Sequence, residues 1–308
     1  MVICKDLNHI QYFEQSILTI GSMDGMHRGH SEIISYIKDV SIINNVPSVV
    51  ITFDPHPKTV LHPDGQSMRW LLGIDKKMEF LEKNSIDYVW VIPFNRDFSQ
   101  ISAGDFMTKY IIDLFNPVDI IIGYDHHFGF KRKGNKDFLN NCKKVYNYNL
   151  HVIEPILYND IPISSSRIRT YLNNCNIIQA NECLGRQYEI SGKIVKGQGR
   201  GAKLGFPTAN IQPHISNQLI PSHGVYCIDA LIEDTYYTGM CNIGQRPTFY
   251  NNGKDVIEVH LFSNDELNLY GKNIDLKFKK YLREERKYSS SSDLIQQLEF
   301  DREVCFTL

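Results

Sequence analysis

The sequence predicts a parallel α/β domain followed by a small antiparallel β-barrel that ends in one helix. Its length of 308 residues corresponds to roughly two domains. Up to about residue 180, short β-rich runs alternate with helical stretches, whereas short strands separated by turns follow one another after Gly185. The change of pattern falls between residues 175 and 187. We therefore predict one domain over 1–182 and a second over 183–308.

The first domain is expected to contain alternating strands and helices. The strand candidates are 17–20, 48–53, 88–91, 119–122 and 151–154, and the helix candidates lie near 29–41, 75–84, 102–115 and 136–147. This alternation predicts right-handed βαβ units and a parallel sheet with helices on both faces. Because ligands of such sheets bind at the carboxyl ends of the strands, the loops after each strand are the candidate functional segments.

The second domain is expected to be a barrel of short strands with a terminal helix. The strand candidates lie near 188–196, 224–232, 236–242, 256–262 and 273–281, and the helix candidate spans 290–299. Turn-rich segments separate these runs, which is typical of antiparallel sheets.

The composition is that of an ordinary soluble globular protein, with 42% apolar and 22% charged residues. A net charge of −2 argues against a broad nucleic-acid or membrane surface, so neither partner is expected. A local basic cluster fits a solvated flap or a phosphate contact better; it consists of Lys131, Arg132, Lys133 and Lys136. Nothing in the sequence calls for an obligate protein partner.

Cysteine usage and the N-terminal segment predict a cytoplasmic protein. The seven cysteines are scattered, odd in number and contain no C-x-x-C pair, which favours a reducing compartment. This pattern predicts neither a zinc site nor a disulfide framework. No apolar run of about 18 residues is present, and the first ten residues, MVICKDLNHI, lack the charged head and apolar core of a signal peptide.

The segment GQGRGAKLGFPTAN, residues 197–210, is the strongest candidate site of the second domain. Its glycines let the backbone approach an anion closely, and its cations add charge for a polyphosphate. If the chain runs extended after the proline, Thr208 and Asn210 lie on one side and offer oxygen ligands for Mg²⁺. The alternative is a glycine-rich hairpin with a proline stop. The candidate ATP-binding residues of the loop are Gly197, Gly199 and Lys203.

The loop GSMDGMHRGH, residues 21–30, follows the first strand candidate. His27 and His30 are three residues apart and are expected to share one helical face. Backbone N–H groups and the helix dipole favour phosphate at a helix N-terminus. Imidazoles placed there stabilise charge that develops on a transferring phosphoryl group. A zinc pair would need further ligands, and no matching cluster appears in the sequence.

Two later segments of the first domain carry weaker signals. The loop GYDHHFGFKRKGN, residues 123–135, places Asp125 and Phe128 between glycines, and the phenylalanine ring is either a stacking contact or a loop anchor. In ISSSRIRTYL, residues 163–172, serines suit helix N-caps and arginine suits phosphate. The two arginines lie about 200° apart on a helix, so one is expected to face a site. A well-capped helix with exposed arginines is the alternative.

In this order the loops resemble the adenylylating module of the nucleotidyltransferase superfamily, and GRGAKLGFPTAN resembles the riboflavin kinase domain. Over nearly its whole length the chain resembles the bacterial bifunctional riboflavin kinase/FAD synthetase family. Further matching segments are CNIGQRPTF, IEVHLF, LYGK and YLREERKY. The resemblance implies a Rossmann-like nucleotidyltransferase domain and a Greek-key barrel. It also implies two reactions: riboflavin and ATP give FMN in the barrel, and FMN and ATP give FAD and pyrophosphate in the α/β half.

The resemblance also implies roles for residues of the kinase half. Thr208 and Asn210 would bind Mg²⁺–ATP, Glu258 would be the catalytic base, and Arg283 would contact the flavin. A base suits this chemistry because a ribityl hydroxyl is a poor nucleophile. Glu258 stands between two apolar residues, so on a strand it projects away from them. The alternative is a solvated strand glutamate.

For the adenylyltransferase half, the resemblance places His27 and His30 at the phosphates of ATP. FMN itself supplies the attacking phosphate, so the protein positions groups and neutralises charge. Asp125 and Phe128 would line the nucleotide or flavin pocket. The other implied ATP contacts are Gly21, Asp24, Ser165, Ser166 and Arg169.

The chain departs from the family pattern in the first half. Met23 replaces an aromatic residue and Ser166 replaces a threonine, which keeps the hydroxyl, while Ser22 replaces a common asparagine. His126 and His127 stand where a phenylalanine and a polar or basic residue are usual, which predicts weakened or retuned FMN adenylylation.

Other functions remain as alternatives. The first is a riboflavin kinase whose first half adenylylates poorly. A flavin-nucleotide-binding regulator would have no need of the base Glu258. A nucleic-acid-binding barrel conflicts with the near-neutral charge and with the lack of an aromatic and basic stripe.

Overall fold

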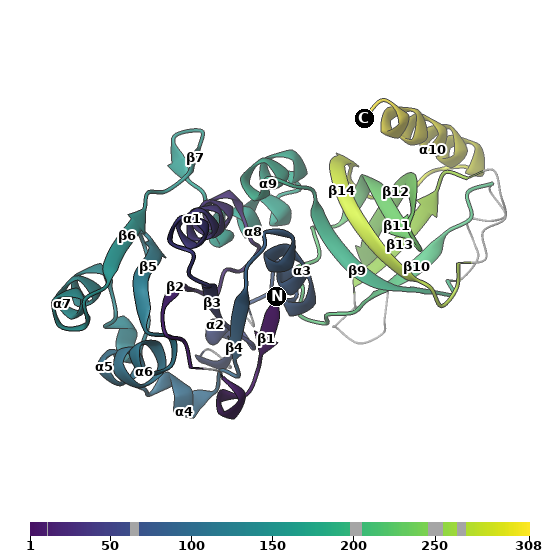
Figure 1. The fold of residues 1–308 in the computed structure, drawn as a ribbon. Helices are drawn as coiled ribbons and strands as arrows, with labels where there is room; N and C mark the ends of the chain where they lie inside the picture. The colour runs from purple at the N-terminus through teal and green to yellow at the C-terminus, as the bar shows by residue number, and fades with distance from the viewer. Residues whose placement is uncertain (11, 62–67, 198–204, 246–254, 264–268) are drawn as a thin grey trace. The chain divides into compact units, whose positions relative to one another are not determined.

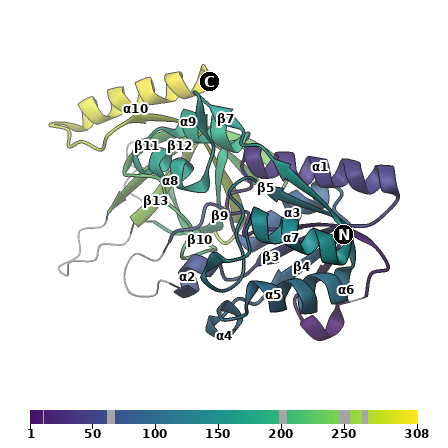
Figure 2. The same ribbon diagram turned by 90° about the vertical axis from the view of Figure 1, so that its left-hand side faces the viewer.

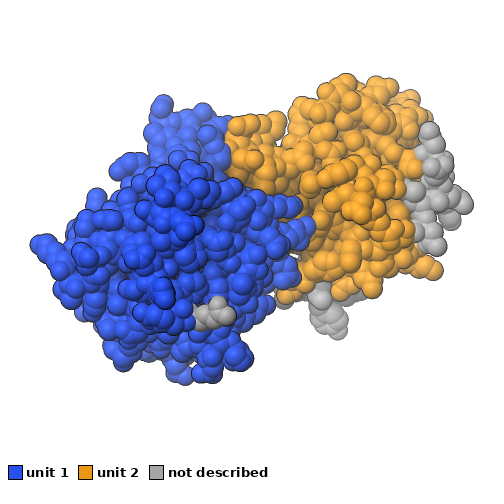
Figure 3. Space-filling view, viewed as in Figure 1, with its two compact units in different colours: residues 1–164 blue, residues 165–308 orange. Residues whose placement is uncertain are grey.

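The computed structural model describes the chain except for residues 11, 62–67, 198–204, 246–254 and 264–268. It divides into two compact units, residues 1–164 and 165–308 (Figure 3). Each unit is described by itself below.

The first unit is built on a sheet in which every pair of neighbouring strands is parallel (Figure 1). In spatial order its strands are β1 (Val2–Cys4), β4 (Tyr88–Ile92), β3 (Ser48–Phe53), β2 (Ser16–Ile20), β5 (Pro117–Gly123) and β6 (Asn149–Ile153). The parallel α/β prediction is confirmed. Sequence reasoning missed only the edge strand β1 of this sheet.

Helices cover both faces of the sheet, as predicted. One face packs against α1 (Arg28–Asn44) and α3 (Ile74–Lys83), and the other against α5 (Ala103–Phe106), a π-helical turn (Met107–Ile112), α6 (Asp113–Phe115) and α7 (Lys136–Tyr146) (Figure 2). Successive strand residues alternate between the two cores, so that Leu18 faces the second group and Ile17 faces α1 and α3. The predicted helix 102–115 is therefore continuous but contains a π turn.

The strand order changes direction between β2 and β5. From β2 the chain builds outward through β3 and β4, and then it returns to add β5 on the other side. Parallel sheets bind ligands at such a switch point, beyond the carboxyl ends of the strands. The loops 21–30 and 123–135 leave β2 and β5 at this point.

Short elements complete the first unit. They are 3₁₀ helices at Leu7–His9 and Phe130–Arg132, helices α2 (Pro57–Leu61) and α4 (Arg96–Ser99), and the hairpin strands β7 (Leu157–Tyr158) and β8 (Ile161–Pro162).

The second unit is a closed antiparallel barrel preceded by two helices and followed by one. Its elements are α8 (Ser165–Asn173), α9 (Ile177–Leu184), β9 (Tyr188–Val195), β10 (Ala209–Pro213), β11 (Gly224–Ile232), β12 (Thr235–Gln245), β13 (Asp255–Leu261), β14 (Asn273–Arg283) and α10 (Ser291–Phe306). The strand order is β10-β13-β12-β11-β14-β9. β11, β12 and β13 pair in sequence and β14 returns beside β11, which is the Greek-key arrangement.

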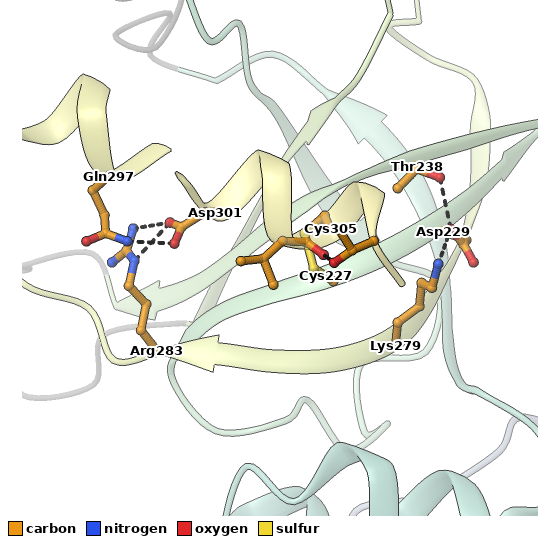
Figure 4. Close-up of a disulfide and its surroundings, with 10 residues drawn as sticks. Cys227, Asp229, Thr238, Lys279, Arg283, Gln297, Asp301 and Cys305 are labelled. Atoms are coloured by element: carbon orange, nitrogen blue, oxygen red, sulfur yellow. Dashed lines mark hydrogen bonds and ion pairs between the residues drawn. A yellow bond between two sulfur atoms is a disulfide. The ribbon is translucent and has the colours of Figure 1, made fainter. Parts of the chain in front are cut away.

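A disulfide and an ion pair fasten α10 to the barrel (Figure 4). Cys227 of β11 is bonded to Cys305 of α10, with the two Cα atoms 5.4 Å apart. The prediction of no disulfide is therefore wrong for this pair. The cysteines are separated by 78 residues in sequence, and only the packing of α10 brings them together. Nowhere in the described part of the chain does a helix combine the length and apolarity that a membrane crossing requires.

Candidate active sites

The loop after β2 is tightly folded against the core of the first unit. Met23, Gly25 and Met26 have φ angles of 45°, 82° and 41°. A Cβ on Gly25 would lie 2.8 Å from Cδ1 of Leu71, so this position needs glycine for both its conformation and its space. The side chains of Met23 and Met26 are buried in the core on the α1 and α3 side of the sheet. Methionine at position 23 therefore keeps a large apolar side chain where the family pattern has an aromatic one.

His27 and His30 lie together at the start of α1. His27 is the N-cap residue, and its carbonyl oxygen accepts hydrogen bonds from the N–H groups of His30 and Ser31 at 2.7 and 2.9 Å. The two imidazole rings are stacked, with centroids 3.7 Å apart. The prediction that the pair shares one face is confirmed. This arrangement places two imidazoles at the positive end of a long helix, where a phosphate group is favoured.

Gly21 and Asp24 tie the same loop to its surroundings. The N–H of Gly21 donates to the carbonyl oxygen of Ile51, at 2.9 Å. Asp24 is 5% exposed, and its Oδ1 accepts a hydrogen bond from the N–H of Leu71 at 3.1 Å. Their contact with ATP stays a prediction.

The loop after β5 is anchored by Phe128. Its ring is buried and packs against Phe106 and Phe138, with centroids 5.5 and 5.9 Å away. Phe128 and Gly134 exchange two backbone hydrogen bonds, and a Cβ on Gly134 would lie 2.7 Å from the Phe128 ring. The ring was expected to be either a stacking contact for a ligand or an anchor of the loop, and its packing is that of a loop anchor. Asp125 is exposed on the same loop, and the pocket-lining roles of both residues stay predictions.

His126 occupies the position where the family pattern has phenylalanine, and its ring centroid lies 5.7 Å from that of Phe128. Burial, together with the neighbouring His127, lowers the pKa of His126 to about 4. The imidazole is thus neutral at pH 7 and packs as an aromatic ring.

The lowered pKa of His126 makes the stability of the first unit sensitive to acid. Between pH 6.5 and 4 the unfolded chain binds a proton that the folded chain does not, so the free energy of unfolding falls as the pH is lowered through this window. We expect the loss attributable to His126 to be about 2 kcal/mol between pH 7 and 5, and we expect His126→Phe to remove it. Urea unfolding followed by tryptophan fluorescence measures this, because Trp70 and Trp90, the only tryptophans, both lie in the first unit. Equal pH dependence in the two proteins would contradict the prediction.

Sequence reasoning missed Lys77 of α3, which is buried beside the loop after β2. The signal is present in the sequence, since Lys77 lies three residues after Ile74 and four before Leu81, within the apolar stripe of an amphipathic helix.

The serine- and arginine-containing segment forms α8 at the start of the second unit. The helix begins at Ser165, as expected from its serines, and includes Ser166 and Arg169. Nε of Arg167 donates to the Tyr171 hydroxyl at 2.9 Å, and its guanidinium lies over the Tyr171 ring. Arg167 thus contacts a residue of its own helix, and the expectation that one of the two arginines faces a site stays a prediction.

Asn210 and Glu258 lie side by side in the barrel wall. Asn210 of β10 is opposite Glu258 of β13, and Glu258 is in turn opposite Asn242 of β12. Directly opposed residues of antiparallel strands project from the same face. Ile257 and Val259 are buried, so Glu258 projects away from the barrel core, as predicted.

Gly197, which follows β9, approaches this row. A Cβ on Gly197 would lie 3.3 to 3.4 Å from the amide atoms of Asn210, so glycine permits close packing here. Thr208 is partly buried and lies two residues before Asn210. Gly199 and Lys203 lie outside the described residues.

Asn242 was missed by sequence reasoning. Its Nδ2 donates to Oε1 of Glu285 at 2.8 Å. This hydrogen bond links the row of Asn210, Glu258 and Asn242 to the segment after β14. The sequence signal is a polar residue between two buried ones, Cys241 and Ile243.

Arg283 holds α10 in place. Its Nη2 and Nε lie 2.7 and 2.9 Å from Oδ2 of Asp301, which is 2% exposed (Figure 4). An open groove of about 460 Å³ lies next to this pair, where the chain enters α10. Its lining residues include Arg286, Tyr288 and Phe300.

Two family models match the chain, one over each half. The family model for FAD synthetase matches residues 9–167, and that for riboflavin kinase matches residues 184–307. A protein of Buchnera aphidicola named bifunctional riboflavin kinase/FMN adenylyltransferase is 36% identical over 94% of this chain and 92% of its own length. A Bacillus subtilis protein of the same name is 33% identical over 94% and 91%. A solved structure titled macrolide-efflux protein from Streptococcus pneumoniae superposes with a TM-score of 0.90 at 26% identity, over 100% of this chain and 99% of that one.

Proposed function

The chain belongs to the bifunctional riboflavin kinase/FMN adenylyltransferase family, and from this premise we propose how its residues divide the two reactions. It phosphorylates riboflavin with ATP to FMN and then adenylylates FMN with a second ATP to FAD, releasing pyrophosphate. We assign adenylylation to residues 1–182 and phosphorylation to 183–308. Because both steps consume ATP, we assign the protein to the cytoplasm.

The cross-strand pair of Asn210 and Glu258 carries the assignment of the kinase site. In our proposal the terminal ribityl hydroxyl attacks the γ-phosphorus of ATP while Glu258 accepts its proton, and the bond from the γ-phosphorus to the bridging oxygen breaks to release ADP. Gly197 lets the backbone approach Asn210 closely, and Gly199 and Lys203 would meet the phosphates.

Thr208 and Asn210 fit a magnesium ion. Both offer neutral oxygen atoms, and a hard cation that keeps waters and substrate phosphates needs few protein ligands. A bound Mg²⁺ would neutralise charge on the phosphates of ATP. The chain's own contribution is to hold these two oxygens two residues apart at the start of β10, next to Glu258.

Arg283 is assigned to the flavin side of the kinase. It would act there by fixing α10 through Asp301, which sets the position of the groove that contains Tyr288 and Phe300. Aromatic side chains at such a groove suit a planar ring system.

In adenylylation, the phosphate of FMN attacks the α-phosphorus of ATP, and the bond to the bridging oxygen of pyrophosphate breaks. His27 and His30 would stabilise charge on the phosphates at the N-terminus of α1. Asp125 and Phe128 would bound the pocket at the loop after β5. The remaining proposed ATP contacts are Gly21, Asp24, Ser165, Ser166 and Arg169. The two alternatives, a kinase with a weak first half and a regulator, are not favoured because both enzymatic domains match.

The protein incubated with riboflavin, ATP and Mg²⁺ should give both FMN and FAD, separated by chromatography. We expect FMN to appear first and then to be consumed, because it is the substrate of the second step. Replacing Mg²⁺ by EDTA should stop both products, since ATP then lacks the cation that neutralises its phosphates. Formation of FMN without FAD would contradict the assignment of the first half, and FAD formation in EDTA would contradict the metal assignment.

A further inference from the structure

A buried lysine connects the loop after β2 with the end of β3. Lys77 projects from α3 and is 5% exposed. Its Nζ donates to the carbonyl oxygen of Ser22 at 2.6 Å and to Oγ1 of Thr52 at 3.2 Å. Oγ1 of Thr52 also donates to the Ser22 oxygen, at 3.4 Å. One ammonium group therefore closes a triangle of hydrogen bonds over the carboxyl ends of two neighbouring strands.

Two carboxylates, on the loops after β2 and β3, compensate the buried charge of Lys77. Burial lowers the pKa of Lys77 to about 8, and the carboxylates of Asp24 and Asp54 oppose this shift. The amine thus remains protonated at neutral pH. Asp24 belongs to the loop after β2 and Asp54 to the loop after β3. A buried cation with partners on both loops favours one arrangement of those loops, because removing a partner leaves the charge uncompensated.

The contact with Ser22 fixes the entrance of the loop that leads to the histidines. In a trans peptide the C=O and N–H point in opposite directions, so a held Ser22 oxygen also sets the direction of the Met23 N–H. The next residues turn through the positive φ angles of Met23, Gly25 and Met26 before α1 begins. Such a sequence of left-handed residues depends on contacts outside the loop to keep it in place.

We propose that Lys77 is a positioning residue for FMN adenylylation, which holds the 21–30 loop so that His27 and His30 meet the phosphates of ATP. Lys77 touches no reacting atom in this role and acts through the Ser22 carbonyl. The inference rests on the proposed function of that loop.

The test replaces Lys77 by methionine, which keeps the buried aliphatic volume and removes the charge and the donors. We expect the KM for ATP in FMN adenylylation to rise about 10- to 100-fold, with a smaller change in the KM for FMN. Riboflavin phosphorylation by the same protein should stay within twofold, because it is assigned to the other unit. Lys77→Arg, which keeps the charge and donors, should recover part of the affinity for ATP.

Lys76→Met is the matched control, because it removes the same charge from the same helix at a surface pair with Glu79. Tryptophan fluorescence of the first unit reports whether each variant folds. If Lys77→Met does not fold, Thr52→Val replaces it and should raise the KM for ATP about threefold or more. A folded Lys77→Met with an unchanged KM for ATP, or an unchanged KM in Thr52→Val, would overturn the inference. His30→Ala is measured alongside. If His30→Ala loses FAD formation while Lys77→Met keeps its KM for ATP, only the inference about Lys77 fails. If His30→Ala is also unaffected, the assignment of the loop itself fails.

Discussion

Replacing Glu258 by glutamine should lower the rate of FMN formation from riboflavin by about 10²- to 10⁴-fold, the usual contribution of a general base. Glutamine keeps the size of the side chain and its place on β13 opposite Asn210 and Asn242. It cannot accept the proton of the ribityl hydroxyl. The rate is measured in single turnovers, with the enzyme in excess over riboflavin and above its dissociation constant and with saturating Mg²⁺–ATP, so that a change in binding does not enter.

The same protein carries its own control for this experiment. Supplied with FMN instead of riboflavin, Glu258→Gln should form FAD within twofold of the wild-type rate, because adenylylation is assigned to residues 1–182. Glu233→Gln is the matched surface variant, since Glu233 lies in the turn between β11 and β12 and pairs with Lys272. A Glu258→Gln protein that still phosphorylates riboflavin at more than a tenth of the wild-type rate would rule out Glu258 as the base.

Most of the fold follows from the spacing of apolar residues. The predicted bounds 48–53 and 224–232 are those of β3 and β11. Both strands are long, largely buried apolar runs, and the ends of such a run mark the ends of the strand clearly. β1 escaped prediction because three residues show no period. β10 escaped prediction because the burial of its residues does not alternate, and its strand character comes from pairing with β9 and β13.

The candidate sites could be predicted where the residues that act together are also close in sequence. His27 and His30 are three residues apart at the start of α1, so their contact follows from the local geometry of the helix N-terminus. Lys77 and Ser22 are 55 residues apart, and the helix that carries Lys77 gives no sign of which loop it meets. The same holds for Arg283 and Asp301, and for the disulfide. Such pairs form only when helices and strands pack against one another, and a single sequence does not show which of them pack together.

Replacing His30 by alanine should lower FAD formation from FMN by about 10²- to 10³-fold, the cost of losing one preorganised group at a developing charge. His30 is the better of the two histidines to test, because His27 is the buried N-cap residue of α1. Riboflavin phosphorylation should be unchanged, and so should both activities of His9→Ala, which alters an exposed histidine of the same unit. FAD formation within threefold of wild type would contradict a role at the phosphates.

The stacking of the His27 and His30 rings allows a second test, in which both histidines are replaced together. Because the imidazoles lie 3.7 Å apart, removing one also removes a packing surface of the other. Residues that act as a unit give non-additive losses, so His27→Ala combined with His30→Ala should cost less than the product of the two single losses. Strict additivity would mean that the two histidines contribute independently, which would contradict their action as one unit at the phosphates.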